Sequence, residues 1–160
     1  MPGPNGDHDR TEAMSTIPEY LDALKARFPS GGDWGEKLAA VLAMEAELPM
    51  MPMEEKTPDT RFHGCQSQIW LVVGRDPETG RFVMKVDSDA RIMRGLLAIA
   101  HGYYHDRMPE EIAAHPPILL RDAGLLDALA PSRANGFYRL LLHIHGLGSE
   151  MAARAKDQVA

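Results

Sequence analysis

Cysteine is scarce in this chain, and a long apolar run is absent from it. Only 1 of the 160 residues is a cysteine, so no disulfide can close within the chain, and the one thiol stays free, as is typical of a reducing compartment. No run of about 18 apolar residues is available to span a bilayer, and the polar segment 1–14 lacks the apolar centre of a secretory signal. We therefore expect a cytoplasmic protein without a membrane partner.

Positive charge is also scarce, because the formal net charge is −6. A surface that binds nucleic acid would need clustered lysine and arginine to displace counterions from the phosphates. The hydrophobic share of 44% and the charged share of 25% are ordinary for soluble globular domains, which argues against the disordered, collagen-like and coiled-coil classes. We expect no nucleic acid among the partners.

The length predicts one domain. A chain of 160 residues can bury a sizeable core but is short for two domains. Residues 1–15 are rich in glycine, proline and charge, which is typical of a disordered arm. Neither an internal repeat nor an inter-domain linker interrupts the remainder, so we expect a single domain over residues 16–160.

Helices are predicted before and after a central region. Thr16 precedes an apolar stripe that stops near Pro29, and Asp33 precedes a second stripe that stops at Pro49. Both polar residues are favoured helix caps, and both prolines are helix stops. Two helices are therefore expected in the first third of the chain.

Four more helical segments follow the central region. The segment 87–89, Asp-Ser-Asp, supplies capping side chains for a strongly apolar helix that runs to about Gly102. Two short helices come next, one beginning at Pro109 and one over residues 118–129. The apolar stripe 137–147 marks a last, long helix.

Three strands are predicted between the two groups of helices. Residues 61–63 read as a short extended piece, residues 68–73 are rich in β-branched and aromatic side chains, and residues 82–86 alternate. The linker 75–80 has proline and glycine where a hairpin turn needs them. The sequence therefore predicts an α+β fold, with a small three-stranded antiparallel sheet that helices cover on one face.

Cys65, the single cysteine, lies in the connection that leads into the first long strand. Its neighbours Gly64, Gln66, Ser67 and Gln68 provide no apolar stripe that would bury it, although free cysteine is usually a buried small hydrophobe. An exposed thiol is prone to oxidation unless it is used. We therefore expect this thiol to lie near solvent and to be functional.

Four roles are open to such a thiol. It could be a hydrolase nucleophile with His63 or a more distant histidine as base, although the local signatures of protease cysteines are absent. It could join a metal site with His101 and His105 or with His143 and His145. It could lie in an interaction module without chemistry. It could also carry sulfur as a persulfide, which needs one nucleophilic thiol, no neighbouring resolving thiol, and a loop that can enter another active site.

Three blocks of sequence resemble the SufE family, the sulfur acceptors of cysteine desulfurases. The blocks are 64–71 (GCQSQIWL), 87–96 (DSDARIMRGL) and 131–136 (PSRANG). Their order and spacing also match the family pattern. With Asp33-Trp34 before the second helix and Glu47-Leu48-Pro49 at its end, the resemblance covers about residues 16–150.

The resemblance implies a SufE-like domain with the compact α+β fold of IscU-type scaffold proteins. It implies that Cys65 accepts sulfane sulfur from a pyridoxal-phosphate-dependent cysteine desulfurase of the SufS or CsdA type and passes it to an iron–sulfur scaffold of the SufBCD type. The pyridoxal phosphate belongs to the desulfurase, so neither a bound cofactor nor a metal is expected here. No turnover is expected from the isolated protein.

The resemblance also points to residues that could support Cys65. Asp87, Asp89 and Arg133 match family positions, and Arg133 either lies near the thiol loop or has a structural role. His63 takes a place where the family often has a different residue. Protonated His63 could favour the thiolate, or its side chain could simply point into water.

Overall fold

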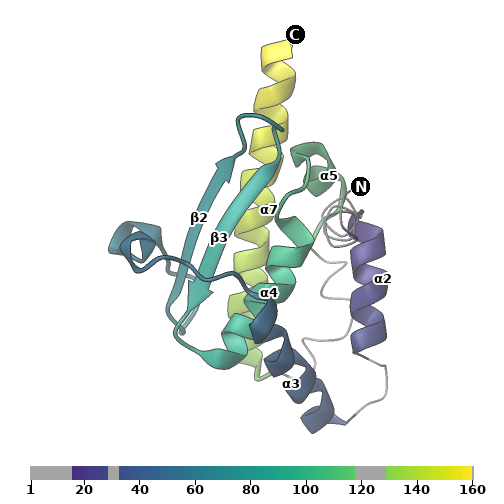
Figure 1. Cartoon of the computed structure of the whole chain (residues 1–160), viewed down its shortest axis with the longest axis vertical. Helices are drawn as coiled ribbons and strands as arrows, with labels where there is room; N and C mark the ends of the chain where they lie inside the picture. The colour runs from purple at the N-terminus through teal and green to yellow at the C-terminus, as the bar shows by residue number, and fades with distance from the viewer. Residues whose placement is uncertain (1–15, 29–32, 118–128, 160) are drawn as a thin grey trace, which may run out of the picture.

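A long hairpin forms most of the sheet (Figure 1). Its strands β2 (Ile69–Arg75) and β3 (Phe82–Ser88) pair antiparallel along their whole length. The short strand β1 (Arg61–Phe62) pairs antiparallel with the start of β2, which gives the order β1-β2-β3. The predicted three-stranded antiparallel sheet is confirmed.

The turn between β2 and β3 forms for local reasons. The Oδ1 atom of Asp76 accepts hydrogen bonds from the backbone N–H of Glu78 at 2.8 Å and of Thr79 at 3.1 Å. Gly80 follows with φ at +76°, a conformation that L side chains rarely adopt. The predicted hairpin turn over residues 75–80 is therefore confirmed.

Residues 16–28, 33–117 and 129–159 are described by this structure, which is a computed structural model. The predicted arm over residues 1–15 lies outside the described residues, as does the predicted helix over 118–129 except for its last residue. No helix in the described part of the chain is both long enough and apolar enough to cross a membrane.

Five α-helices and three 3₁₀ turns occur in the described ranges. The helices are α2 (Ile17–Arg27), α3 (Trp34–Ala43), α4 (Arg91–Tyr104), α5 (Pro109–Ala114) and α7 (Pro131–Val159). The 3₁₀ turns are η1 (Met44–Glu47), η2 (Met53–Glu55) and η3 (Pro58–Thr60). The second predicted helix therefore changes to 3₁₀ geometry over its last turn, and the last helix extends well beyond the apolar stripe that marked it.

The helices α4 and α7 lie behind the hairpin in Figure 1, and α2 lies on the far side of α4. The helix α4 packs against β3 and η1 and also contacts α2, α3 and α7. Its side chains Leu96, Leu97, Ile99 and Tyr103 are fully buried. Burial of each such side chain stabilises the fold by roughly 1.5–3 kcal/mol. The α+β architecture, with a central apolar helix, is confirmed.

The predicted cap of α4 is wrong. Ala90 holds the N-cap position, and no side chain caps the helix there. Asp87 instead belongs to β3, where its Oδ2 lies 2.8 Å from Nζ of Lys56 and its Oδ1 lies 3.2 Å from Nε of Arg94. Asp87 is buried. A buried carboxylate without a compensating charge destabilises a protein more than a helix without a capping side chain does.

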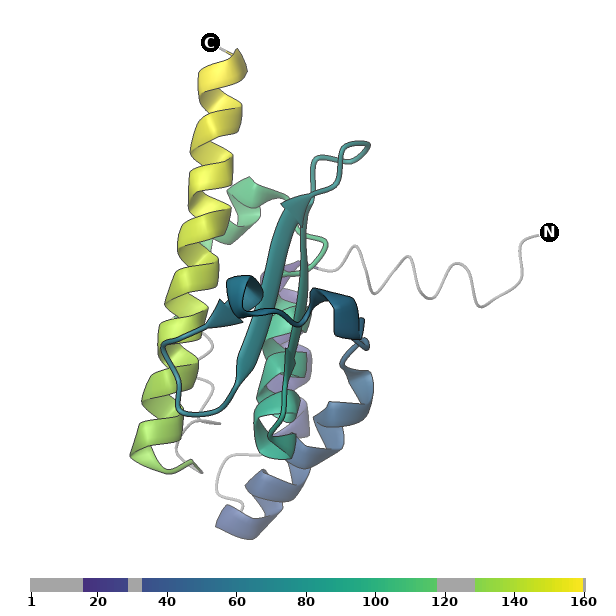
Figure 2. The ribbon, with the colours of Figure 1, turned by 90° about the vertical axis from the view of Figure 1, so that its left-hand side faces the viewer.

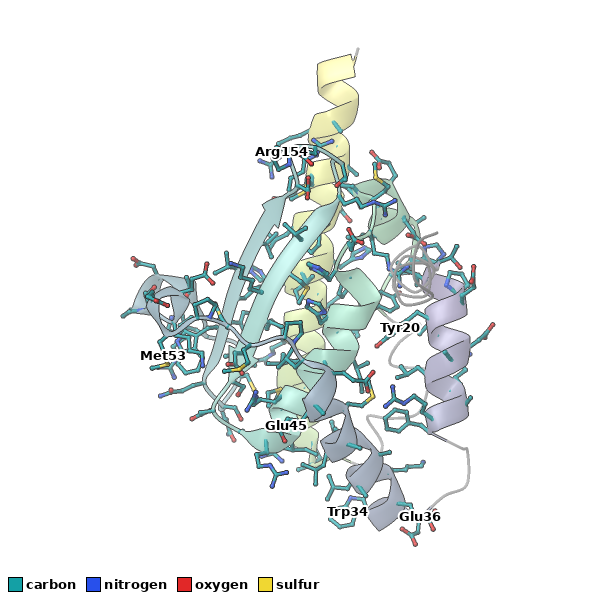
Figure 3. The ribbon with its side chains drawn as sticks, viewed as in Figure 1. Tyr20, Trp34, Glu36, Glu45, Met53 and Arg154 are labelled. Atoms are coloured by element: carbon teal, nitrogen blue, oxygen red, sulfur yellow. The ribbon has the colours of Figure 1, made fainter. Side chains whose placement is uncertain are left out.

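A second acidic residue, Glu45, extends this network from η1, where Figure 3 labels it. Glu45 of η1 accepts hydrogen bonds from Nε of Arg91 at 3.1 Å and from Nη1 of Arg94 at 3.2 Å. Arg94 therefore joins η1 to β3 through two carboxylates. We call Glu45, Lys56, Asp87, Arg91 and Arg94 the ion-pair cluster.

Candidate functional site

The loop that carries Cys65 lies beside the amino-terminal half of α7 (Figure 2). It connects β1 to β2 and comprises residues 63–68. Cys65 is half-buried, where the sequence predicted a thiol near solvent. The prediction considered only the neighbours in sequence, and the burial comes from α7, which is distant in sequence.

Gly136 of α7 is the residue on which Cys65 packs. A Cβ atom at position 136 would lie 2.9 Å from Sγ of Cys65, 3.2 Å from its Cβ and 3.3 Å from its Cα. Contacts this short mean that Cys65 would have to shift if position 136 carried a side chain. The thiol therefore rests close to bare helix backbone, an approach that glycine permits without such a shift.

A second contact holds the same segment on α7. The ring of Phe62 lies 5.5 Å from that of His143, centroid to centroid, with the planes tilted by 35°. A Cβ atom at Gly64 would lie 2.5 Å from the Phe62 ring, so the loop crosses directly over that ring. The stretch from Phe62 to Cys65 is thus anchored on α7 at two points, Gly136 and His143, which are about two helical turns apart.

Asp89 holds the other end of the loop. Its Oδ1 accepts a hydrogen bond from the backbone N–H of Gln68 at 3.2 Å, and its own N–H donates to the carbonyl of Gln68 at 3.4 Å. This pairing continues the β2–β3 ladder by one residue toward Cys65. Asp89 therefore positions the loop through Gln68, and its carboxylate does not line the hollows beside the thiol.

Two hollows flank the thiol. The Arg139 hollow, of about 390 Å³, is lined by the loop together with Ser132, Asn135, Gly136 and Arg139 of α7. The smaller Arg133 hollow, of about 150 Å³, also contains Cys65 and extends along Ser67, Ala130, Ser132 and Arg133. Access to the half-buried sulfur therefore exists on the side of each arginine.

The charged groups that the structure describes in these hollows are cations. None of the described residues that line either hollow is an aspartate or glutamate. Within the ranges that the structure describes, neither the guanidinium of Arg133 or Arg139 nor the ring of His63 makes a hydrogen bond or an ion pair. The predicted supporting residues Arg133 and His63 therefore lie beside Cys65, together with Arg139, which sequence analysis did not single out.

His101, His105 and His145 do not line the hollows beside the thiol. The rings of His101 and His105 stack 4.2 Å apart at 18°, and Nδ1 of His105 accepts a hydrogen bond from the N–H of Met84. Burial, with the neighbouring charge of His105, lowers the pKa of His101 from 6.5 to about 4. Burial also lowers the pKa of His105 and that of His145. These rings are therefore neutral members of the structure at pH 7.

Metal-ligand geometry is not formed in the described ranges. There, no three side chains among histidine, cysteine, aspartate and glutamate are arranged to hold a metal ion. The two histidine pairs that the sequence suggested are used in other ways, since His105 is hydrogen-bonded to β3 and His143 packs on Phe62. Neither pair lines a hollow with Cys65.

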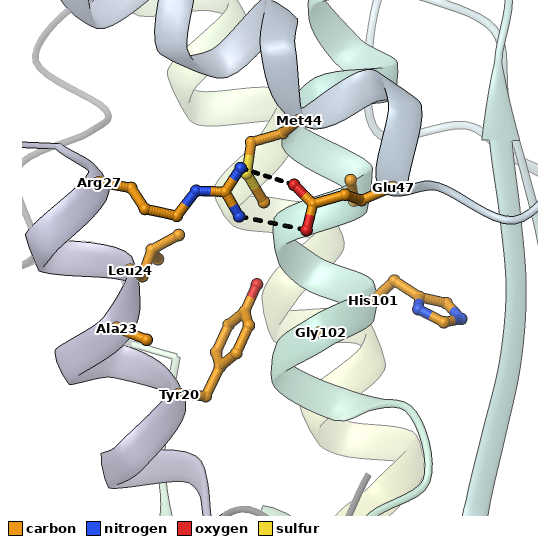
Figure 4. Close-up of a pocket in the computed structure, with 9 residues that line it drawn as sticks. Tyr20, Ala23, Leu24, Arg27, Met44, Glu47, His101 and Gly102 are labelled. Carbon is orange, nitrogen blue, oxygen red and sulfur yellow. Dashed lines mark hydrogen bonds and ion pairs between the residues drawn. The ribbon is translucent and has the colours of Figure 1, made fainter. Parts of the chain in front are cut away.

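A further hollow, of about 140 Å³, lies between α2, η1 and α4 (Figure 4). At its rim Arg27 donates to both carboxylate oxygens of Glu47, at 3.1 and 2.6 Å. The Tyr20 hydroxyl donates to the carbonyl of Ile99 at 2.9 Å. Arg27, Glu47 and Tyr20 therefore bond within the protein, and none of the described residues that line this hollow is a cysteine or serine.

A family model describes the region that contains all of these features. The model for SufE, an Fe–S metabolism associated domain, matches residues 22–147 of the chain. The chain belongs to the SufE family. An uncharacterized SufE-like protein of Rhizobium etli is 34% identical to it over 127 residues, which cover 78% of this chain and 86% of the relative.

A solved structure has a similar fold. The solution structure of a hypothetical protein from Thermus thermophilus matches with a TM-score of 0.65 and covers 86% of this chain and 96% of its own. The sequences are 19% identical. The predicted SufE-like fold is confirmed, and the SufE family ties this chain to iron–sulfur metabolism.

Proposed function

We propose that this SufE-family protein accepts sulfane sulfur on Cys65 from a cysteine desulfurase and passes it to an iron–sulfur scaffold. The observation that carries the proposal is the seating of the family's cysteine. The single thiol of the chain rests on the bare backbone of Gly136, with a hollow open beside it. Such a thiol is partly shielded and still reachable by a partner.

The transfer is a thiol–persulfide exchange. The Cys65 thiolate attacks the outer sulfur of the donor persulfide, a new S–S bond forms at Sγ, and the donor's S–S bond breaks. The donor leaves as a thiolate, so one sulfane sulfur moves and nothing is oxidised or reduced overall. The outer sulfur of Cys65 then loses its proton to water. The same exchange in the opposite sense hands the sulfur to the scaffold.

A lone cysteine suits this chemistry. A second thiol nearby would attack the persulfide, release sulfide and leave a disulfide behind. The chain has no second cysteine, so the sulfur stays on Cys65 until a partner's thiol arrives. The reducing cytoplasm is the compartment in which a free thiol of this kind persists.

The expected partners follow from the same chemistry. The donor is a desulfurase of the SufS or CsdA type, which holds the pyridoxal phosphate that liberates sulfur from cysteine. The recipient is a scaffold of the SufBCD type. The isolated protein then has no turnover of its own and raises the turnover of the desulfurase.

A cysteine hydrolase with a histidine base is less well supported. His63 lines the same hollow as Cys65, but within the described part of the chain no hydrogen bond joins a histidine ring to the thiol. A hydrolase nucleophile needs its base within hydrogen-bond reach. Ester probes that acylate Cys65 in the native protein, and fail to do so in His63→Ala, would favour the hydrolase.

Intact mass spectrometry tests the proposal directly. The protein is incubated briefly with a cysteine desulfurase from the same organism and free cysteine, with Cys65→Ser in parallel. We expect one additional sulfur atom that a thiol reductant removes, and no addition to the variant. An unchanged mass beside an active desulfurase would contradict the proposed function.

A further inference from the structure

Arg139 lies one helical turn beyond Gly136, on the same side of α7. Residues three apart on a helix are neighbours on its surface, and helical side chains lean toward the amino terminus. The Arg139 side chain therefore extends back over the turn that carries Gly136, where the Cys65 sulfur rests. Both residues line the Arg139 hollow, which places the guanidinium beside the space open to Cys65.

Arg139 makes no ion pair with another residue that the structure describes. The other described residues that line this hollow include His63, Ser132 and Asn135, and none of them has a carboxylate. Elsewhere in the described chain, guanidinium groups such as those of Arg27 and Arg94 lie against acidic side chains. In a chain with a net charge of −6, a cation left without an acidic partner beside the thiol is suited to an anionic ligand.

The persulfide of Cys65 supplies an anion at this place. Its outer sulfur would lie about 2 Å beyond Sγ, and it ionises more readily than a thiol. The backbone of Gly136 closes one side of Sγ, so the outer sulfur is directed into the adjoining hollow. No side chain at position 136 separates it from Arg139.

We propose that Arg139 holds the outer sulfur of the Cys65 persulfide as an anion in the Arg139 hollow, an inference that rests on the proposed sulfur-acceptor function. The anionic sulfur is a poor target for an attacking thiolate, because like charges repel and because the neutral persulfide is the better electrophile. Arg139 thereby protects the bound sulfur from cellular thiols. A thiolate that carries no outer sulfur lies at the wall of the hollow, about 2 Å short of the position of the outer sulfur, and gains less from Arg139.

The test loads sulfur without a desulfurase. Inorganic polysulfide donates one sulfane sulfur to the Cys65 thiolate and leaves as a polysulfide one sulfur shorter. The loaded full chain, Arg139→Ala, Arg139→Lys and the control Arg154→Ala are then exposed to dithiothreitol at about pH 7.4, near the physiological range in which such groups titrate, and persulfide loss is followed by intact mass. Arg154 is on the same helix but pairs with Glu150, one turn away.

We expect the persulfide of Arg139→Ala to be lost about two- to fivefold faster than that of the native protein, as for an exposed charge contact. Arg139→Lys keeps part of the protection because it retains the charge, and Arg154→Ala matches the native protein. The pH at which persulfide alkylation reaches half its maximal rate rises by about half a unit in Arg139→Ala. Alkylation of the unloaded thiol changes by a smaller factor than persulfide loss does in each Arg139 variant.

Equal persulfide lifetimes in the native protein and in Arg139→Ala would overturn the inference. A rate change that appears equally in the unloaded thiol would also overturn it, because it would indicate a displaced loop. Failure of this inference can be told apart from failure of the proposed function. If the desulfurase fails to load Cys65 while polysulfide loading shows the Arg139 effect, the proposed donor is wrong and the anion site stands.

Discussion

The cations of the ion-pair cluster have acidic partners, whereas the described cations in the hollows around Cys65 have none. In the ion-pair cluster, Lys56 lies 2.8 Å from Asp87, and Arg94 lies 3.2 Å from Asp87 and from Glu45. Around the thiol, Arg133 and Arg139 have no acidic partner in the described ranges. Paired charges join elements of the fold, whereas these unpaired charges contribute little to stability and remain available to a ligand.

The carboxylate of Asp87 pairs with both Lys56 and Arg94. Its removal should break the ion-pair cluster and cause the largest loss of stability. We expect Asp87→Ala to lower the free energy of unfolding by about 3 kcal/mol, because it leaves two cations beside a buried position. Urea denaturation measures the change. The matched control is Glu47→Ala, which breaks the exposed pair with Arg27 and should cost less than about 1 kcal/mol. Equal losses in the two variants would mean that burial does not distinguish these pairs.

A side chain at position 136 should change the reactivity of the Cys65 thiol more than the stability of the fold. We expect Gly136→Ala to cost about 1–3 kcal/mol, as overpacking does, and to displace the loop so that iodoacetamide alkylates Cys65 faster. Gly146→Ala on the same helix is the control. A Cβ atom there meets nothing within 4 Å, so it should gain up to about 1 kcal/mol from helix propensity. Stabilisation by both alanines would show that Cys65 does not need the bare backbone.

The smallest expected effect concerns pH. His101 has a pKa near 4 in the fold against 6.5 as the ordinary value, so the unfolded chain binds more protons between these values and stability falls as pH falls through this window. Between about pH 6.5 and 5.5 we expect His101 to account for a loss of about 1 kcal/mol. Comparison of urea midpoints for the native protein and His101→Gln checks this contribution. The variant should lose less stability, and parallel curves would contradict the assignment.

Local patterns in the sequence were enough for much of the fold. Alternation in 82–86, the proline and glycine of 75–80 and the apolar stripe of α4 each depend on neighbours in sequence, and each prediction is confirmed. The prediction that Asp87 caps α4 was wrong because the role of Asp87 depends on a residue distant in sequence. Its partner Lys56 lies on a different segment, and no local pattern indicates that a capping residue has been taken up by a distant cation.

The candidate site was also predicted where the signal is local in sequence and missed where it depends on distant residues. The position of Cys65 in a loop before β2 was predicted from sequence, but its seating on Gly136 joins residues 71 positions apart (136 minus 65). Gly136 belonged to the third family block, which was the available signal, yet glycine in a block of sequence does not identify its contact. Arg139 lies outside all three blocks, and only the geometry of α7 brings it to the thiol.

The bare backbone under Cys65 has a consequence for how a partner can meet the sulfur. A helix backbone is stiff and cannot rotate aside as a side chain can, so one hemisphere around Sγ is permanently closed. Attack on or by a sulfur atom runs along the line of the bond that forms, and that line must therefore come from the open hemisphere. The sulfurs of donor and recipient would then both reach Sγ from the side that holds the two hollows. For the proposed sulfur transfer, this means that the backbone of α7 limits both partners to that side of the loop.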